Sequence, residues 1–249
     1  MKVKLSDFIA DRLAVLGISQ VFMVAGGGSM HLNHSLATHS LITCTHNHHE
    51  QACAMAADSY FRLSGKLAVV NVTTGPGATN AITGVYGAWT DSLGMLVISG
   101  QVKWETTVQS TALPLRQLGD QEINIIKSIE SLTKYAITIT NPNSIKYHLD
   151  KAIYLATSGR PGPTWIDIPI NVQASIIDTD ELIGFDPSEI DEPWKTTDLP
   201  NICQTILEKL SRAERPVILA GTGIRLSRST DIFYQVVNDL QIPVTTAWN

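Results

Sequence analysis

The chain has 249 residues, and the residue types and patterns that it has few of exclude several classes of protein. Charged residues make up only 16% of it, and its formal net charge of −5 gives no basic surface of the kind that binds nucleic acid. Its three cysteines lack CxxC spacing, which argues against a disulfide scaffold or a zinc site. No apolar run approaches the roughly 20 residues that span a membrane. We therefore expect a cytoplasmic protein without nucleic-acid or membrane partners.

Short apolar runs alternate with helical patterns along most of the chain. The pattern predicts helices over residues 5–16, 30–38, 49–63, 78–88 and 144–157, and strands over residues 21–24, 41–45, 67–72, 95–99 and 165–170. Residues 100–120 have no clear period and are predicted to form a long loop. Continuous apolar strands separated by helices predict an α/β fold, a doubly wound parallel sheet with helices on both faces.

Composition changes near Asp178, which predicts a domain boundary. We assign residues 1–180 to the first domain and the Asp-, Glu- and Pro-rich residues 181–200 to a linker. Residues 201–249 predict the start of a second, Rossmann-like α/β domain. Two strands with their helices cannot close a core, so we expect this domain to be incomplete in the chain. Its Gly221-Thr222-Gly223 turn lacks the third glycine of a dinucleotide-binding fingerprint.

Glu50 is the first candidate for a functional residue. It lies between a predicted strand and a predicted helix, at an edge where open parallel sheets bind ligands. From position alone, a glutamate that stabilises the helix dipole is the simpler interpretation. Two glycine loops, Gly26-Gly27-Gly28 and Thr74-Gly75-Pro76-Gly77, also follow strands and allow close approach of backbone to a ligand. Neither is a Walker or GxGxxG motif, so we do not expect this domain to cradle a phosphate.

The neighbouring histidines suggest a metal site, but their spacing argues against it. His46, His48 and His49 do not place two ligands at positions i and i+4 of one helix. We predict no metal site in this chain and expect His49 to line a polar pocket.

Several motifs together resemble one enzyme family. In order, they are His49-Glu50-Gln51, Gly75-Pro76-Gly77-Ala78-Thr79-Asn80, Ser99-Gly100-Gln101-Val102 and Arg160-Pro161-Gly162-Pro163 with Trp165-Ile166-Asp167-Ile168-Pro169. This order is similar to that of acetolactate-synthase-like enzymes, which depend on thiamine diphosphate. Residues 213–223 resemble the start of that family's central domain.

The resemblance implies a thiamine-diphosphate-dependent lyase or transferase that acts on pyruvate or another 2-oxo acid. Glu50 would activate the cofactor by a hydrogen bond to N1′ of its aminopyrimidine. The residues implied to border that ring are Gly26, Gly27, Thr74, Pro76 and Asn80.

The resemblance also implies parts of the site that this chain lacks. The family holds the diphosphate and Mg²⁺ with a Gly-Asp-Gly motif, whereas this chain has Gly119-Asp120-Gln121. We therefore expect the Mg²⁺ site in a domain beyond residue 249. Many members keep FAD, which is a further candidate cofactor. Because the family builds each site from two subunits, we expect a homodimer or homotetramer and no turnover by this chain alone.

Departures from the family pattern leave the acceptor substrate open. Gln121, Glu122 and Lys134 match the family pattern, whereas Asp120 stands where the family has an apolar phenylalanine. The resemblance implies that Asp120, Gln121 and Lys134 contact the substrate. The run VFMVAGGG over residues 21–28 is closer to relatives that act on nucleotide sugars in polysaccharide synthesis. Transfer of an acyl unit to a nucleotide sugar is thus one alternative, and a non-catalytic nucleotide-binding module is another. A split enzyme is disfavoured, because residue 249 falls inside the predicted second domain.

Overall fold

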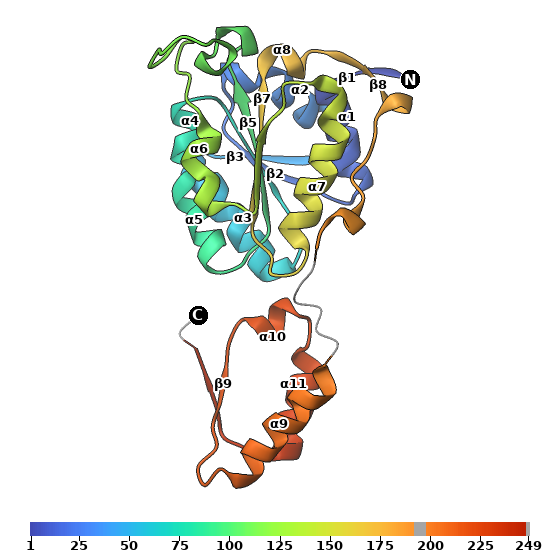
Figure 1. The fold of residues 1–249 in the computed structure, drawn as a ribbon. Coiled ribbons are helices and arrows are strands. Elements are labelled where there is room, and N and C mark those ends of the chain that lie inside the picture. The colour runs from blue at the N-terminus through green and yellow to red at the C-terminus, as the bar shows by residue number, and fades with distance from the viewer. Residues whose placement is uncertain (192–197, 248–249) are drawn as a thin grey trace. The chain divides into compact units, whose positions relative to one another are not determined.

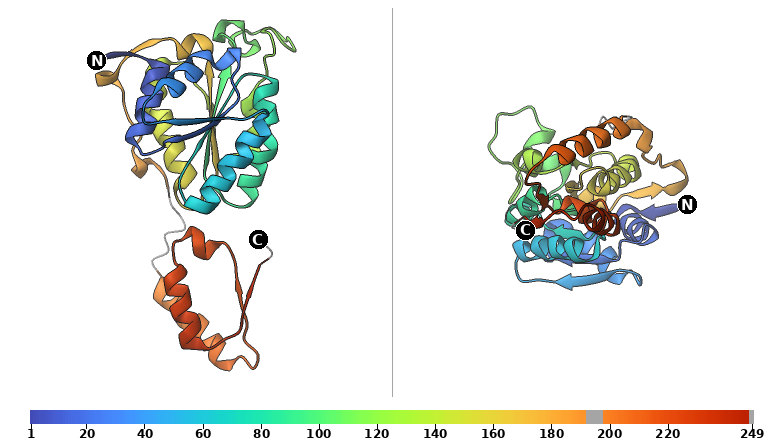
Figure 2. Two further views of the ribbon diagram at one scale, coloured as in Figure 1. Left: turned by 180° about the vertical axis from the view of Figure 1, so that it is seen from behind. Right: turned by 90° about the horizontal axis from the view of Figure 1, so that it is seen from below.

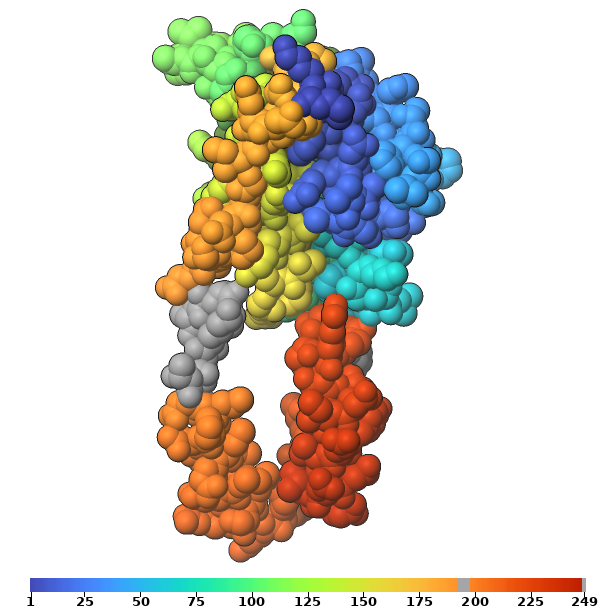
Figure 3. All heavy atoms as spheres, turned by 90° about the vertical axis from the view of Figure 1, so that its right-hand side faces the viewer, coloured from blue at the N-terminus to red at the C-terminus, as the bar shows by residue number. Residues whose placement is uncertain are grey.

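The computed structural model describes residues 1–191 and 198–247, in two compact units, Met1–Glu189 and Ile190–Asn249. The first unit extends past residue 180, where we placed the end of the first domain. Leu182 is buried in its core, and the ring of Phe185 packs 5.7 Å from that of Tyr147. Figure 3 shows this orange segment along the surface beside the yellow helix α7 (Ile145–Thr157). The predicted linker therefore begins within the first unit, and its residues 192–197 lie outside the described residues.

The first unit is built on one six-stranded parallel sheet (Figure 1), which confirms the predicted fold class. In spatial order its strands are β3 (Thr43–His46), β2 (Gln20–Met23), β4 (Val69–Val72), β5 (Met95–Gln101), β7 (Pro163–Pro169) and β6 (Tyr135–Thr138). Every residue of β4, β5 and β7 is buried. That two-sided burial explains why these strands are rich in apolar residues and do not alternate between apolar and polar residues.

Helices cover both faces of this sheet, as Figures 1 and 2 show. One face carries α1 (Leu5–Val15), α2 (Met30–Thr38), α7 and α8 (Ile170–Gln173). The other carries α3 (Glu50–Ser64), α4 (Pro76–Asn80), α5 (Ile82–Thr90) and α6 (Ile125–Ile129). Right-handed crossovers put successive helices on opposite faces whenever the chain reverses direction across the sheet. No helix of the described residues is long and apolar enough to cross a membrane.

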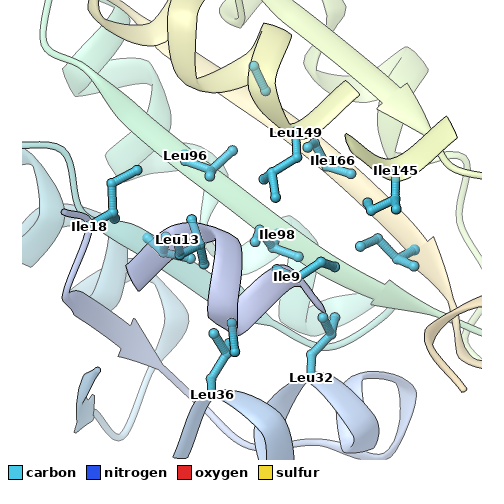
Figure 4. Close-up of a cluster of buried hydrophobic side chains, with 14 of the residues drawn as sticks. Ile9, Leu13, Ile18, Leu32, Leu36, Leu96, Ile98, Ile145, Leu149 and Ile166 are labelled. Atoms are coloured by element: carbon cyan, nitrogen blue, oxygen red, sulfur yellow. The ribbon is translucent and has the colours of Figure 1, made fainter. Parts of the chain in front are cut away.

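The core lies between the sheet and the first of these helical faces (Figure 4). Residues four apart point the same way on a helix, so Ile9 and Leu13 of α1 and Leu32 and Leu36 of α2 meet the sheet as pairs. Each is fully buried, which stabilises the fold by about 1.5–3 kcal/mol per side chain.

The structure adds elements that the sequence pattern missed. Strand β6 is short and half-buried, and its run YAIT carries little periodic signal. A two-stranded antiparallel sheet pairs β1 (Lys2–Lys4) with β8 (Ile176–Asp178), segments too distant in sequence to predict as partners. The helix predicted over residues 78–88 is two helices, α4 and α5. Short 3₁₀ helices complete the unit: Gly27–Ser29, Trp104–Thr106, Val108–Ser110, Glu130–Leu132, Pro142–Ser144, Thr179–Glu181 and Pro187–Glu189.

The second unit contains the α/β elements that the sequence predicted. They are α9 (Leu199–Arg212), β9 (Ile218–Ala220), α10 (Gly223–Leu226), α11 (Thr230–Leu240) and β10 (Val244–Thr246). Strands β9 and β10 pair in parallel, with Val244 opposite Ile218. No residue among 198–247 is buried, because two strands with their helices enclose no core of their own.

Candidate cofactor and substrate site

The loops that follow the parallel strands gather at the carboxyl edge of the sheet. Strands β2 and β4 are neighbours there, yet the chain leaves β2 for β3 on one side and continues from β4 to β5 on the other. Loops diverge at such a reversal and leave a crevice, which is where open α/β sheets bind ligands. The glycine loop at Gly26, the loop at Thr74 and the helix that begins at Glu50 all lie at this edge.

Glu50 is the first residue of α3, and its side chain is only 8% exposed. His49 caps the helix, because its Nδ1 accepts a hydrogen bond of 3.1 Å from the Gln51 backbone N–H. Asn80 Nδ2 donates a 2.9 Å hydrogen bond to Glu50 Oε2. No hydrogen bond to Oε1 is found within the described chain. One oxygen of a shielded carboxyl group is thus held in place, while the other is left for a donor from a ligand.

Gly77 keeps the space beside this carboxyl group open. A Cβ atom at residue 77 would lie 3.3 Å from Glu50 Oε1 and 2.7 Å from Thr73 Cγ2. A larger residue would therefore press on both. The aminopyrimidine of thiamine diphosphate fits these residues, because its ring nitrogen needs a carboxyl oxygen that is shielded from water and free of protein partners.

The glycine loop is held in place by polar side chains from three elements. The carbonyl of Gly26 accepts hydrogen bonds from Ser29 Oγ (3.3 Å) and Asn33 Nδ2 (3.2 Å), and Gly28 N–H donates to Thr73 Oγ1 (3.0 Å). A Cβ atom at residue 26 would lie 2.5 Å from Thr73 Cβ. Sequence reasoning missed Thr73, since nothing in the sequence marks it apart from its place beside Thr74.

Thr74 is oriented by Gln101 at the end of β5. Its Oγ1 donates to Gln101 Oε1 over 2.5 Å, while Gln101 Nε2 donates to the carbonyl of Ile123 over 3.0 Å. Because the hydroxyl proton of Thr74 points to Gln101, the remaining lone pairs of Oγ1 can only accept. Gln101 was not among the predicted site residues, although it stands in the Ser99-Gly100-Gln101-Val102 motif that could have identified it.

Behind Gln101 lies Asp167 of β7, which is fully buried. Its carboxyl group accepts hydrogen bonds from Ser99 Oγ (2.5 Å) and Gln101 Nε2 (3.3 Å). Burial raises the pKa of Asp167 to about 7, although the hydrogen bonds from Ser99, Gln101 and Thr138 oppose that rise. A polar chain thus runs from the centre of the sheet to Thr74.

A pocket of about 720 Å³ opens at this edge. It is lined by Gly26, Gly27, Gly28, Thr73, Thr74, Gln101, Val102, Lys103, Thr106, Leu118, Gly119, Asp120, Gln121 and Ile170. The structure therefore brings five of the predicted residues together: Gly26, Gly27, Thr74, Asp120 and Gln121. Gly75 allows this, because its φ is +59° and a Cβ atom there would lie 2.3 Å from the Gln121 carbonyl oxygen.

The other predicted residues lie outside the pocket lining. Glu50, Pro76 and Asn80 lie next to it, with Pro76 as the first residue of α4. The structure does not bring Lys134 to this edge, because it directly precedes β6 and so lies at the amino edge of the parallel sheet. There Lys134 Nζ donates to the Ser158 carbonyl over 2.8 Å, and burial lowers the pKa of its ammonium group. Among residues 1–191 and 198–247, no three His, Cys, Asp or Glu side chains group as a metal site.

Comparison with known protein families identifies the class of protein. The family described as thiamine pyrophosphate enzyme, N-terminal TPP binding domain, matches residues 3–127, and the chain belongs to this family.

Individual relatives point further, to acetolactate synthases. The acetolactate synthase large subunit of Lactococcus lactis is 36% identical over 245 residues, which are 97% of this chain and 40% of the relative. The probable large subunit of Methanocaldococcus jannaschii is 32% identical over 97% of this chain and 39% of its own length. Acetolactate synthase 1 of Oryza sativa, a chloroplastic protein, is 32% identical over 97% of this chain and 36% of its own length. The chain thus spans 36–40% of the length of these relatives.

Proposed function

We propose that this chain is the pyrimidine-binding part of a thiamine-diphosphate-dependent enzyme that converts pyruvate to acetolactate. The observation that carries the proposal is the state of Glu50, a carboxyl group shielded from water with one oxygen bonded to Asn80 and the other free. Membership of the thiamine pyrophosphate family and similarity to acetolactate synthases support it.

In this proposal Glu50 holds a proton between its Oε1 and the pyrimidine nitrogen N1′. Asn80 keeps the carboxyl group in one orientation, and Gly77 leaves room for the ring beside it. Gly26, Gly27, Thr74 and Pro76 border the ring. The cofactor, when bound, supplies a nucleophilic carbon for attack on the 2-oxo acid.

The pocket beside Thr74 is where we place the substrate. Asp120 and Gln121 line it, and the Oγ1 of Thr74 presents only acceptor lone pairs to it. Lys134 is left out of the proposed site, since it lies at the opposite edge of the sheet. The relatives favour pyruvate over the two alternatives, a nucleotide-sugar acceptor and a non-catalytic module.

Further components enter the proposal through the family resemblance. Mg²⁺ would bind the cofactor diphosphate, but the described residues offer no donor set for it, and we assign it no step. FAD is likewise assigned no residue.

We propose at least a dimer, supported by the exposed apolar side chains of Met55, Tyr86 and Trp89 on the adjacent helices α3 and α5. Free thiols at all three cysteines support a cytoplasmic location.

The test is Glu50→Gln in the full-length protein that carries this chain. We expect exchange of the C2 proton of bound thiamine diphosphate to slow about 100-fold or more, since a positioned acid–base group contributes at least that much. Circular dichroism should show an unchanged fold. The control is Glu130→Gln, the same substitution at an exposed position. Unchanged C2 exchange in Glu50→Gln would refute the role of Glu50, and a wild-type protein that forms no acetolactate from pyruvate would refute the reaction.

A further inference from the structure

One wall of the pocket is a long loop with little regular structure. Residues 102–124 join β5 to α6 and contain only two 3₁₀ helices, Trp104–Thr106 and Val108–Ser110. Yet this loop supplies half of the pocket lining, namely Val102, Lys103, Thr106, Leu118, Gly119, Asp120 and Gln121. Something other than a helix or strand ladder must hold these residues in place.

The carboxyl group of Glu122 ties the two arms of this loop together. Its Oε1 accepts a 2.6 Å hydrogen bond from Val108 N–H. Its Oε2 accepts two more, from Leu118 N–H and Gly119 N–H, both at 3.0 Å. The Glu122 side chain therefore bonds the backbone at both ends of the exposed turn formed by residues 109–117. Hydrogen bonds to an ionised acceptor are about twice as strong as neutral ones.

The tied segment is also fitted tightly against the rest of the site. A Cβ atom at residue 119 would lie 2.7 Å from Val102 Cγ2 and 2.8 Å from the Thr106 carbonyl oxygen. Two residues on, the Gln121 carbonyl packs against Gly75. Gln121 itself has a φ of +58°, a left-handed conformation that costs energy for a non-glycine residue and persists only where its surroundings hold it.

We propose that Glu122 is the positioning residue of this pocket. It contributes no atom to the lining, but its carboxyl group fixes the backbone at Leu118 and Gly119, directly before Asp120 and Gln121, and joins it to Val108 on the other arm of the loop. Without it, three backbone donors lose their acceptor, and the wall that carries Asp120 and Gln121 opens. The substrate role of the pocket rests on the proposed function above, whereas the closure of the loop by Glu122 does not.

Trypsin measures that opening directly, because Arg116 is the only lysine or arginine between residues 104 and 126. In the whole chain without ligand, we expect cleavage after Arg116 to accelerate about tenfold in Glu122→Gln and more in Glu122→Ala. A glutamine at residue 122 has one oxygen that accepts a hydrogen bond and an NH₂ group that cannot, so it can still hold only one of the two arms of the loop. Glu130→Gln is the control, and the thermal unfolding midpoint should stay near that of the wild type. Equal cleavage in all four proteins would overturn the proposal, as would a rise at every tryptic site with a lower unfolding midpoint.

Hydrogen exchange of the wild-type chain decides the matter even if the variants fail to fold. The amides of Val108, Leu118 and Gly119 should exchange about tenfold or more slowly than those of Gln117 and Asp120, for which no acceptor is found among the described residues. Equal exchange of all five amides would overturn the proposal.

Steady-state kinetics of the full-length enzyme separate a positioning role from a structural one. We expect Glu122→Gln to raise the KM for pyruvate several-fold while C2 proton exchange stays unchanged, because Glu50 is untouched. An unchanged KM would overturn the positioning role. If the wild-type protein does not act on pyruvate at all, the proposed function fails, while the trypsin and exchange results still decide whether Glu122 closes the loop.

Discussion

Asn80 and Glu50 lie 30 residues apart in the sequence and are joined by a hydrogen bond of 2.9 Å from Nδ2 to Oε2. The bond links the last residue of α4 to the first residue of α3. It occupies one oxygen of a carboxyl group that has no other partner within the described chain. The geometry of the proposed cofactor contact therefore depends on an amide from a different helix.

Asn80→Ala should weaken cofactor activation without abolishing it. Loss of the amide leaves the Glu50 carboxyl group able to rotate, so we expect C2 proton exchange to slow about tenfold in the full-length protein, less than in Glu50→Gln. Asn80→Asp should slow it further, because an aspartate carboxylate cannot donate the hydrogen bond to Glu50 Oε2 and repels the Glu50 carboxylate instead. Exchange at the wild-type rate in both variants would mean that Asn80 does not orient Glu50.

Asp167 should make stability fall as the pH rises. Burial raises its pKa from 3.8 to about 7, so the folded chain binds this proton more tightly than the unfolded chain. The resulting stabilisation is fully present below about pH 4 and is lost as the pH rises through 7, a change on the order of 4 kcal/mol. Urea unfolding at pH 5 and pH 8 measures the part of it that falls between these pH values, about 2–3 kcal/mol. The wild type should lose more free energy of unfolding between these pH values than Asp167→Asn, which has no carboxyl group to titrate. If both proteins lose the same amount, the raised pKa of Asp167 is contradicted.

Gly75→Ala should destabilise the chain more than Gly65→Ala does. Both glycines have positive φ. Gly65 is left-handed helical, with a ψ of 11°, and an alanine there costs about 1–2 kcal/mol; Gly75 has a ψ of −119°, outside the left-handed helical region, so an alanine there costs at least as much. Only at residue 75 does the new Cβ meet backbone, 2.3 Å from the Gln121 carbonyl oxygen, which adds about 1–3 kcal/mol. Chemical denaturation of the two variants measures the difference in cost, to which the backbone conformation of Gly75 and its contact with Gln121 both contribute. Equal free energies of unfolding would show that Gln121 does not pack against Gly75.

Lys134→Met should leave substrate binding unchanged, in contrast to Asp120→Phe. Lys134 Nζ bonds the Ser158 carbonyl at the far edge of the sheet, so its loss should cost only about 1 kcal/mol of stability. Asp120 lines the pocket, and an aromatic ring there should change the KM for pyruvate in the full-length enzyme. A raised KM in Lys134→Met would restore the substrate role that the sequence motif implied.

Much of the fold could be predicted because the main strands are buried on both faces. The runs that form β4, β5 and β7 are mostly apolar, with single polar residues such as Asn71, Ser99 and Asp167, and the helices between them have clear periods. Strand β6 could not be predicted, since its four residues are only half-buried and show no alternation of buried and exposed positions. That omission also misplaced Lys134. Without β6, nothing in the sequence shows that Lys134 precedes a strand and so lies at the edge opposite Glu50.

The site was predictable where a motif follows a strand, and not where distant side chains meet. Gly26, Thr74 and Gln121 were found from their motifs, and they line one pocket. The bonds made by Asn80 and Gln101 depend on how the β4 and β5 loops pack, which no local pattern encodes. Glu122 matched the family motif, but its three backbone partners lie on a loop without periodicity.

The Thr73 side chain occupies the space into which Cβ atoms at Gly26 and Gly77 would extend, at 2.5 Å and 2.7 Å. Two loops from different strands are thus shaped around one methyl group. Neither loop can acquire a larger residue by a single step unless position 73 gives way as well. We expect these three positions to change together or not at all over evolution. Anyone who redesigns this site for a bulkier acceptor must treat them as one unit.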